Sequence, residues 1–443
     1  MSKMTGPGCI VLVASTTSYR ADAFLEASRK VGAEVMVASD RCHVLDKHWT
    51  WPANSLVVDF YAPEEAARVI ARAARTRTLS PVRAVVPAEG ESAALVAAMA
   101  SEALGLPANA VSAAAAALNK HTMRQLCAGK GIPTPRFLCL DFDVDPALAA
   151  TRIAAEIGWP CVLKPLLLSA SRGVIRADDA SAFCVALARL RRMLSKPELR
   201  ELDPVASRHV LCESFVPGPE VALEGLLTRG ELRTLTLFDK PDPLDGPFFE
   251  ETIYVTPSRL TEPTQEVIRT ATAAAAAALG LRTGPVHAEI RLPPHGPPIV
   301  IEVAARTIGG LCARTLRFGT GLSLEELVLR HALGQDVIAV ERQKQSAGVM
   351  MIPIPQGGVL KAVDGVAFAR AVPGIEDVVI SVRPGEKIVP LPEGASYLGF
   401  VFARGETPAF VDAALRTAHR RLAFTITPTL PLIEESDVAT GAL

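Results

Sequence analysis

The chain has 443 residues, enough for about three domains of ~150 residues each. Its 47 acidic and 46 basic residues form no long run of one sign, which argues against nucleic acid or an anionic membrane as a main partner. The alanine-rich run Ala273–Leu281 is far shorter than the ~20 residues of a membrane span. Met1–Gly8 lacks the pattern of a signal peptide. We therefore expect a cytoplasmic protein.

Eight cysteines, at positions 9, 42, 127, 139, 161, 184, 212 and 312, form no CxxC pair. Most lie in apolar stretches, which favours reduced core cysteines over a disulfide framework. The eight histidines show no zinc-binding spacing either.

The first 115 residues alternate short apolar strands with helices. The expected strands are Cys9–Ala14, Glu34–Ala38 and Ala84–Pro87, and the expected helices are Ala21–Val31, Ala62–Thr76 and Glu91–Leu104. This alternation predicts a doubly wound, mostly parallel sheet. The first strand–helix turn, Ser15–Arg20, contains no GxGxxG, so a dinucleotide-binding Rossmann domain is disfavoured. We interpret the aromatic segment His48–Pro52 as packing, with a ligand platform as the alternative.

Residues 116–345 mix helices and strands in an α+β pattern, and we expect a second domain there. Within it, Val210–Val216 and Val221–Thr228 flank a Gly/Pro turn, which predicts an antiparallel hairpin. From residue 346 to 443 strands dominate, with one clear helix at Phe410–Ala423. We expect a small, separate, β-rich C-terminal domain there.

Two acidic residues on neighbouring strands form the strongest chemical pattern. His287, Glu289 and Arg291 share one face of the expected strand Pro285–Leu292, because alternate strand residues point the same way. Glu302 lies on the next strand, after the turn Pro293–Pro298, and a hairpin would place it beside Glu289. Two adjacent carboxylates repel unless a cation separates them, and oxygen ligands suit Mg²⁺. The alternative is a structural hairpin with exposed charges.

Further candidates follow the same logic of charge and close backbone approach. Arg306 can offer a guanidinium fork to a carboxylate or phosphate, and Gly309–Gly310 permits close approach of a ligand. Lys164 precedes a loop of small residues that includes Ser169, Ser171 and Gly173, whose amides and hydroxyls suit phosphate oxygens. Lys120 is a second candidate phosphate cation.

The segment Glu213–Glu220 runs from a strand into the turn Pro217–Gly218–Pro219. Backbone groups of this segment can face a flat base, and Glu220 can accept hydrogen bonds from ribose hydroxyls. A hairpin carrying two surface glutamates is the alternative.

Together these motifs resemble the ATP-grasp superfamily, in the expected order over roughly residues 119–335. The resemblance implies a nucleotide-binding lid at about residues 130–215, with Lys120 and Lys164 as phosphate lysines. It implies that Glu213, Phe215 and Val216 form the adenine hinge and that Glu220 binds the ribose. Glu289 and Glu302 match the magnesium ligands, and Arg306 matches the catalytic arginine. The segment Glu302–Gly310 and the tail from Gly348 are similar to the L-amino-acid ligases, which are dipeptide synthetases.

Two departures from the family pattern concern the metal and the phosphate loop. Many relatives have Asn two residues after the second glutamate, where this chain has Ala304, so one or two Mg²⁺ ions remain open and Mn²⁺ is an alternative. The phosphate loop contains only one glycine, Gly173, where relatives often have several.

The resemblance implies an ATP-dependent ligase that activates a carboxylate as an acyl phosphate and couples it to an amine. Glu250 or Glu251 is the candidate for a substrate ammonium group, with Glu251 preferred and a solvated loop as the alternative. His287, Gly309, Gly310 and Arg314 are the further candidate substrate residues. Activation of bicarbonate, or an ATP-binding protein without turnover, are the competing interpretations. Small-molecule carboxylates and amines are the expected partners, and a homodimer is left open.

Overall fold

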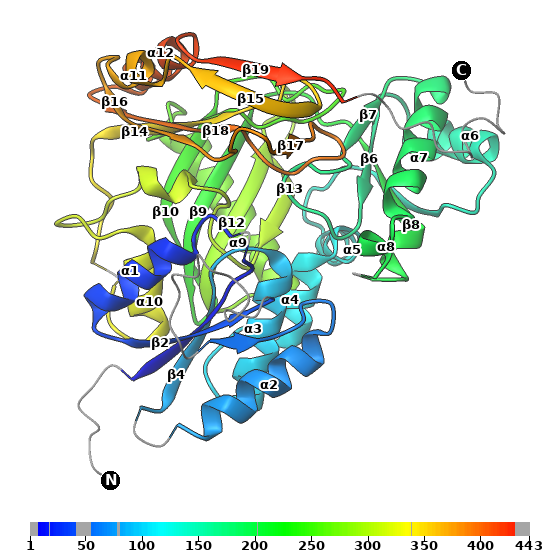
Figure 1. Ribbon diagram of the computed structural model, residues 1–443. Helices are drawn as coiled ribbons and strands as arrows, with labels where there is room; N and C mark the ends of the chain where they lie inside the picture. Colours follow the sequence, from blue (N-terminus) through cyan, green and yellow to red (C-terminus); the bar gives the residue numbers. More distant parts are fainter. Residues whose placement is uncertain are drawn as a thin grey trace.

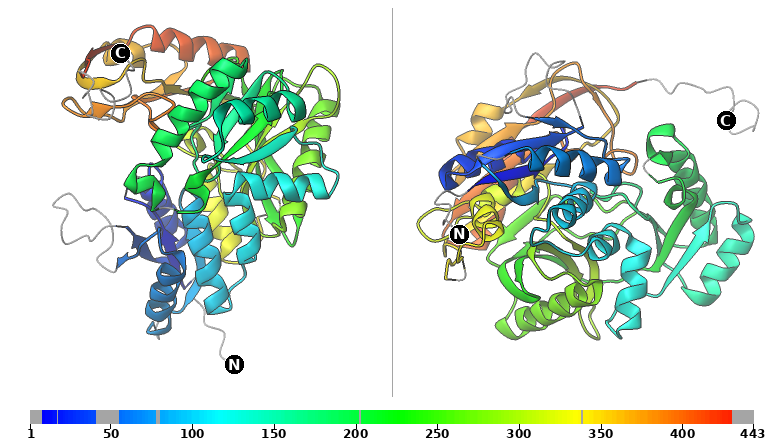
Figure 2. Two further views of the ribbon diagram at one scale, coloured as in Figure 1. Left: turned by 90° about the vertical axis from the view of Figure 1, so that its right-hand side faces the viewer. Right: turned by 90° about the horizontal axis from the view of Figure 1, so that it is seen from below.

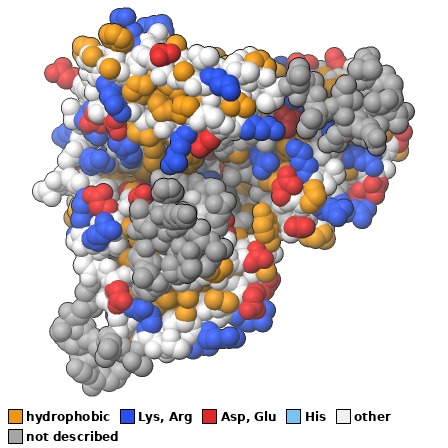
Figure 3. Space-filling view, viewed as in Figure 1, with side chains coloured by type: hydrophobic (Ala, Val, Ile, Leu, Met, Phe, Trp, Pro, Cys, Tyr) orange, Lys and Arg blue, Asp and Glu red, His pale blue; other side chains and the backbone are white. Residues whose placement is uncertain are grey.

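A computed structural model describes residues 8–16, 18–40, 55–77, 80–201, 203–337 and 339–429. Cys42 and the segment His48–Pro52 lie outside these residues, and the other seven cysteines are free thiols. Along the described chain no helix combines the length and the apolar character needed to cross a membrane. On the face shown in Figure 3, basic and acidic side chains are interspersed, as the balanced composition leads one to expect.

The N-terminal unit is a parallel four-stranded sheet with helices on both faces, as predicted (Figure 1). The strand order is β3-β2-β1-β4. Its elements are β1 (Cys9–Val13), α1 (Ala21–Val31), β2 (Glu34–Ser39), β3 (Leu56–Val57), α2 (Pro63–Arg75), β4 (Val82–Pro87) and α3 (Glu91–Leu104). One face packs on α2 and α3, and the other joins a core that continues into the rest of the molecule.

Two short helices connect this unit to the remainder of the chain: α4 (Val111–Leu118) and α5 (Lys120–Gly129). The alanine run Ala113–Ala117, for which no helix is predicted, forms most of α4. Alanine has the highest intrinsic helix propensity, and most of these alanines are buried. The side chain of Asn119 accepts hydrogen bonds from the amides of His121 and Thr122 and thereby caps α5. This cap fixes Lys120 in the first turn.

The next segment folds into a lobe of its own, to the right in Figure 1 and also distinct from the body in Figure 2. Its antiparallel sheet has the order β5-β8-β6-β7. The elements are β5 (Phe137–Asp141), α6 (Pro146–Glu156), β6 (Cys161–Pro165), β7 (Ile175–Ala177), α7 (Ala180–Leu194), α8 (Pro197–Arg200), η2 (Ala206–Arg208) and β8 (His209–Ser214). A separate apolar core joins this sheet to α6 and α7. We call this lobe, residues 137–214, the lid.

A continuous eight-stranded sheet forms the centre of the molecule, in the order β13-β12-β9-β10-β11-β14-β18-β16. Its strands are β9 (Glu220–Thr228), β10 (Glu231–Lys240), β11 (Ile253–Thr256), β12 (Gly284–Arg291), β13 (Ile299–Ala304), β14 (Ser346–Ile352), β16 (Ile375–Ile380) and β18 (Gly399–Gly405). Of the helical elements, α9 (Glu262–Leu279) packs on β10, β12 and β13, α10 (Leu324–Ala332) contacts β12, and η3 (Cys312–Thr315) contacts β14 and β18. β11 pairs with β14 along four residue pairs, so the sheet continues across the domain boundary predicted at 345/346.

The C-terminal region adds a second, smaller layer above the end of this sheet (Figure 1). It comprises β15 (Gly358–Asp364), α11 (Val366–Arg370), β17 (Lys387–Ile388), α12 (Pro408–His419) and β19 (Ala423–Thr427), with the small sheet ordered β17-β15-β19.

The predicted hairpin between Val210–Val216 and Val221–Thr228 is wrong. β8 pairs with β5 and β6 in the lid, whereas β9 pairs with β10 and β12 in the central sheet. Gly218 explains the crossover: its φ is +104°, and a Cβ there would lie 2.1 Å from the carbonyl oxygen of Leu292. The turn therefore lies in direct contact with the central sheet. It leads the chain from the lid sheet into the central sheet.

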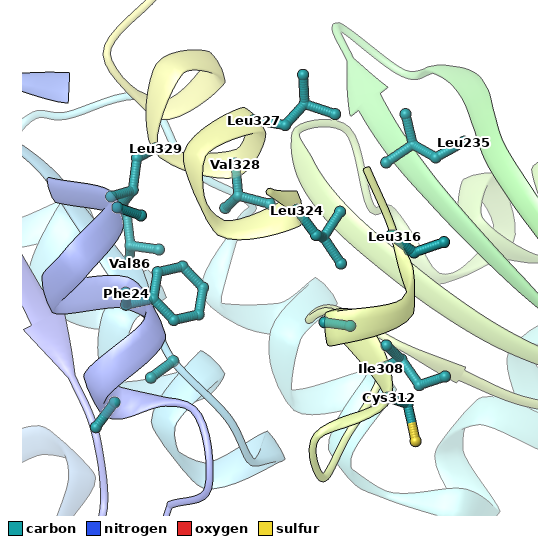
Figure 4. Close-up of a cluster of buried hydrophobic side chains, with 14 of the residues drawn as sticks. Phe24, Val86, Leu235, Ile308, Cys312, Leu316, Leu324, Leu327, Val328 and Leu329 are labelled. Atoms are coloured by element: carbon teal, nitrogen blue, oxygen red, sulfur yellow. The ribbon is translucent and has the colours of Figure 1, made fainter. Parts of the chain in front are cut away.

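The packing between the N-terminal unit and the central sheet is apolar. Phe24 of α1 and Val86 of β4 lie in one cluster with residues of α10, and Figure 4 shows these side chains facing one another. Ile308 and Cys312 belong to the same cluster, and the sulfur of Cys312 points away from the labelled leucines (Figure 4). The segment after β13 is thus anchored to the N-terminal unit.

Candidate active site

The two glutamates of the candidate metal pair are direct cross-strand neighbours. β12 and β13 are antiparallel, and the register places Glu289 opposite Glu302, as the sequence predicted. Alternate residues of the same strands, such as Ala288 and Val303, are buried on the opposite face, which fixes the direction of the glutamates. Nζ of Lys120 lies 3.3 Å from Oε2 of Glu302. The carboxylate donor set fits an oxygen-loving divalent cation.

A buried lysine that the sequence did not reveal sits beside this pair. Nζ of Lys240 is 2.7 Å from Oε1 of Glu220 and 3.2 Å from Oε1 of Glu289, and it also contacts Glu251. Burial alone would lower the pKa of Lys240, but the three carboxylates raise it well above its ordinary value. These carboxylates have oxygens within 4.8 Å of one another, close enough to share a metal, yet a protein ammonium group already bridges them.

Glu251 and Glu289 differ strongly in acidity because their surroundings differ. Burial and the charge of Glu289 raise the pKa of Glu251 to about 7, against the opposing effect of Lys240. Burial would also raise the pKa of Glu289, but Lys240 and His287 hold it well below its usual range. Glu289 is therefore the carboxylate that is ionised at neutral pH, as a metal ligand must be.

His287 is held as a cation beside Glu289. Its Nδ1 lies 2.6 Å from Oε1 of Glu224, its direct partner on β9, and its Nε2 lies 3.6 Å from Oε1 of Glu289. Burial lowers the pKa of His287, but the hydrogen bonds and charges of the two glutamates outweigh it and raise the pKa to about 9. Glu224 is fully buried, and the sequence analysis did not identify it.

The phosphate-lysine candidate Lys164 is fixed by a buried ion-pair network. Oε2 of Glu213 lies 2.7 Å from Nζ of Lys164, and Oε1 lies 2.6 Å from Nε of Arg124. Nη2 of Arg124 also donates to the carbonyl of Ile301 on β13, at 2.5 Å. The carboxylate of Glu213, expected at the adenine hinge, is thus engaged by two cations. Through these contacts the Glu213 side chain connects the lid to the β12–β13 hairpin, which carries Glu289 and Glu302. It also orients Lys164.

The expected adenine hinge is organised by Arg291. Its guanidinium donates to the carbonyl of Val216 at 2.7 Å and to Oε2 of Glu220 at 2.9 Å. It also lies over the rings of Phe215 and Phe249, 5.2 and 5.6 Å from their centroids. One side chain therefore fixes the hinge carbonyl, the ribose candidate and an aromatic wall.

The small-residue loop after Lys164 adopts a strained conformation. Ala170 and Ser171 have φ values of +54° and +53°, which L-residues rarely adopt outside functional loops. Ser169 and Ser171 line the cavity, but Gly173 does not. The amide of Gly173 donates to the carbonyl of Pro392 at 2.8 Å, and a Cβ there would collide with Met193 and Pro165. Gly173, which we expect to contact phosphate, therefore lies outside the cavity lining, with its amide engaged by Pro392.

The segment that follows Glu302 contributes Arg306 and the glycine pair. Arg306 lines the cavity, and its Nη1 donates to the carbonyl of Thr307 at 2.9 Å. The amide of Gly310 donates to Oε1 of Glu89 at 2.8 Å, which connects this segment to the N-terminal unit. Arg314 was expected at the substrate site but points elsewhere. It pairs with Asp377 at 2.9 Å and lies over the ring of Phe402.

One cavity of about 1380 Å³, its solvent-open part included, collects the remaining candidates. All of the predicted site residues except Gly173 and Arg314 line it. Residues that line it without having been predicted include Tyr19, Glu89, Tyr254, Met351 and Tyr397. They come from the N-terminal unit, β11 and the C-terminal region, and no local sequence signal marks them.

Comparison with known proteins identifies this arrangement. An ATP-grasp domain model matches residues 157–315, and a model of the L-amino acid ligase C-terminal domain matches residues 350–427. The D-alanine–D-alanine ligase of Gloeobacter violaceus is 30% identical over 242 residues, which cover 51% of this chain and 72% of that protein. The chain belongs to the ATP-grasp superfamily.

Within this superfamily the similarity to amino-acid ligases extends to the whole fold. The crystal structure of an L-amino acid ligase from Bacillus licheniformis superposes with a TM-score of 0.79 at 25% identity, covering 96% of this chain and 100% of that one. Alanine–anticapsin ligase of Bacillus subtilis is 30% identical over 247 residues. That match covers 52% of this chain and 50% of the relative, so the ATP-grasp chain spans about half the length of this relative.

Proposed function

We propose that this ATP-grasp protein is an ADP-forming ligase that phosphorylates the carboxylate of an amino acid and couples it to an amine, giving an amide or dipeptide. The proposal rests chiefly on Glu289 and Glu302, which face each other across β12 and β13 and line one cavity together with Lys120, Lys164 and Arg306. The similarity to the L-amino acid ligase of B. licheniformis and to alanine–anticapsin ligase supports an amino acid as the acid.

Glu289 and Glu302 would hold Mg²⁺, which supplies positive charge to the polyphosphate. Ala304 offers no side-chain oxygen to a second ion. Lys120 is in place to contact phosphate, because its Nζ already lies between the carbonyl of Leu168, at 2.8 Å, and Glu302. Lys164 is held by Glu213 and lines the same cavity. These cations offset the repulsion between a carboxylate and a triphosphate.

In the first step a carboxylate oxygen attacks the γ-phosphorus of ATP, the bond to the bridging oxygen breaks, and ADP leaves. In the second step the amine nitrogen attacks the acyl carbon, and phosphate and a proton are released. Arg306 would hold the acyl oxygen as negative charge develops on it. Closure of the lid limits access of water to the acyl phosphate.

The test is ADP release by the purified chain with ATP, Mg²⁺ and a panel of amino-acid pairs, with products identified by mass. We expect release to require an amino acid, whereas release driven by bicarbonate alone would overturn the proposal. Arg306→Ala and Glu302→Ala should each lower turnover by about 100-fold or more. Glu231→Gln, at the exposed start of β10, is the matched control and should leave turnover unchanged.

A further inference from the structure

Besides the β12–β13 hairpin, three parts of the chain that contact one another line the cavity. These parts contribute a group of five side chains that we call the inner compartment. They are Tyr19 from the N-terminal unit, Tyr254 of β11, Cys312 of η3, Met351 of β14 and Tyr397, which precedes β18.

The walls of the inner compartment are apolar and fixed. Tyr254, Cys312 and Met351 are each at most 3% exposed. The rings of Tyr19 and Tyr397 both pack edge-on against Phe400, at centroid distances of 5.4 and 6.0 Å. Sγ of Cys312 lies 3.7 Å from Sδ of Met351, and thioether and aromatic surfaces adapt well to apolar groups of varied shape.

The cations closest to the inner compartment, Lys240 and Arg20, are already paired with the carboxylates of other residues. Glu251 lies beside it and acts electrostatically on Tyr254, Tyr397 and Cys312. The five lining side chains include no cation. Burial of a substrate carboxylate among them would leave that charge unpaired, at a cost of several kcal/mol. A compartment with an acidic edge and apolar walls matches an α-amino acid whose ammonium group faces Glu251.

The inner compartment also lies next to the place where a carboxylate would be activated. Tyr254 lies under the ammonium group of Lys240, 5.0 Å from its ring centroid, and Lys240 in turn contacts Glu289. Cys312 follows Arg306 by six residues. A carboxylate held by Arg306 would therefore place its own substituents toward the inner compartment. The acyl donor is held through both chemical steps, whereas the amine joins only the second.

We propose that the inner compartment binds the side chain of the acid-donating amino acid and selects large apolar side chains over small or charged ones. This inference rests on the ligase activity proposed above. One methylene group in such a pocket is worth roughly 10- to 200-fold in kcat/KM. Leucine, methionine or phenylalanine should accordingly exceed alanine by at least about 10-fold as donor, and aspartate should be inactive.

Hydroxylamine identifies the donor, because it traps the acyl phosphate as the hydroxamate of the activated amino acid. The full chain is assayed with ATP, Mg²⁺, hydroxylamine and single amino acids, and both ADP and hydroxamate are measured. ADP release with hydroxamates chiefly from glycine, alanine or charged amino acids would overturn the inference and leave the ligase proposal intact. If no amino acid supports ADP release, both proposals fail.

Met351 and its neighbour provide a matched pair of variants. Met351→Ala enlarges the inner compartment and should raise the preference for phenylalanine over leucine by about 10-fold. Met350→Ala removes the same volume from the other face of β14, where Met350 packs in the core beneath α12. It should lower stability similarly without changing that preference. An equal change in preference in both variants, or in neither, would refute the role of Met351.

Discussion

Replacement of Glu213 by glutamine tests whether the lid and its lysine are held by one buried carboxylate. Glu213 contacts Lys164 and Arg124, and all three side chains are at least 90% buried. Burial alone would raise the pKa of Glu213, but the two cations hold it at about 2, against 4.5 for an unperturbed glutamate. At 1.36 kcal/mol per pKa unit this difference corresponds to about 3 kcal/mol. Loss of one partner from a buried ion pair costs a similar ~3–5 kcal/mol.

Thermal unfolding followed at pH 7 provides the measurement. At roughly 2 °C per kcal/mol for a large unit, Glu213→Gln should lower Tm by about 6–10 °C. It should also raise KM for ATP, since Lys164 loses its fixed position. The control Glu156→Gln removes an exposed i,i+4 partner of Arg152, which is worth at most ~0.5 kcal/mol. A Tm within 1 °C of the wild type together with an unchanged KM would show that the network does not hold Lys164.

Three further outcomes are expected. Because the folded-state pKa of Glu213 is depressed, the stability gap between wild type and Glu213→Gln should be full above pH 4.5 and close as pH falls toward 2, measured by urea unfolding. Lys240→Met leaves the carboxylates of its cluster without their cation, which raises their folded-state pKa values. The Tm of this variant should therefore fall below that of the wild type least under pH 4.5, and the difference should grow as pH rises. A Tm difference that does not change with pH would contradict this. Arg189 of α7 pairs with Glu393 through two contacts, of 2.7 and 2.9 Å. This ion pair connects the lid to the C-terminal region, and both side chains are partly exposed. We therefore expect Arg189→Gln to raise KM for ATP only about 3- to 5-fold. Adding Glu393→Gln in the double variant should have no further effect.

Local patterns predicted what depends on local physics. The helices Ala21–Val31 and Glu91–Leu104 were predicted with the bounds the structure has, since each ends at a glycine with positive φ. The pairing of Glu289 with Glu302 followed from strand alternation and one short turn. No local pattern marked Lys240 or Glu224, because these residues reach the other charged side chains only when β9, β10 and β12 lie side by side.

Elsewhere the predictions of strand pairing failed, because the paired residues lie far apart in the sequence. The segments around Gly218 look like the two arms of a hairpin, and only the contact of this turn with Leu292 reveals that they enter different sheets. Strands β10 and β11 were missed, and β14 was placed in a separate domain although it pairs with β11. Such contacts join residues about 100 positions apart, and neither periodicity nor turn chemistry encodes them.

Ala304 stands where many relatives have asparagine, and the charges around Glu289 and Glu302 explain how the site can do without that side-chain oxygen. Six glutamates line the cavity, and together they would repel one another at neutral pH without cations. The chain supplies fixed cations at Glu289, where Lys240 and an imidazolium at His287 already offset its charge. Glu302 faces only Lys120 among the ion pairs of the described residues. A divalent ion would therefore gain most on the side of Glu302, and we propose that the pair holds one strongly bound ion. A second ion would be repelled by the two protein cations near Glu289. The absence of a side-chain oxygen at Ala304 therefore costs the site little affinity for metal.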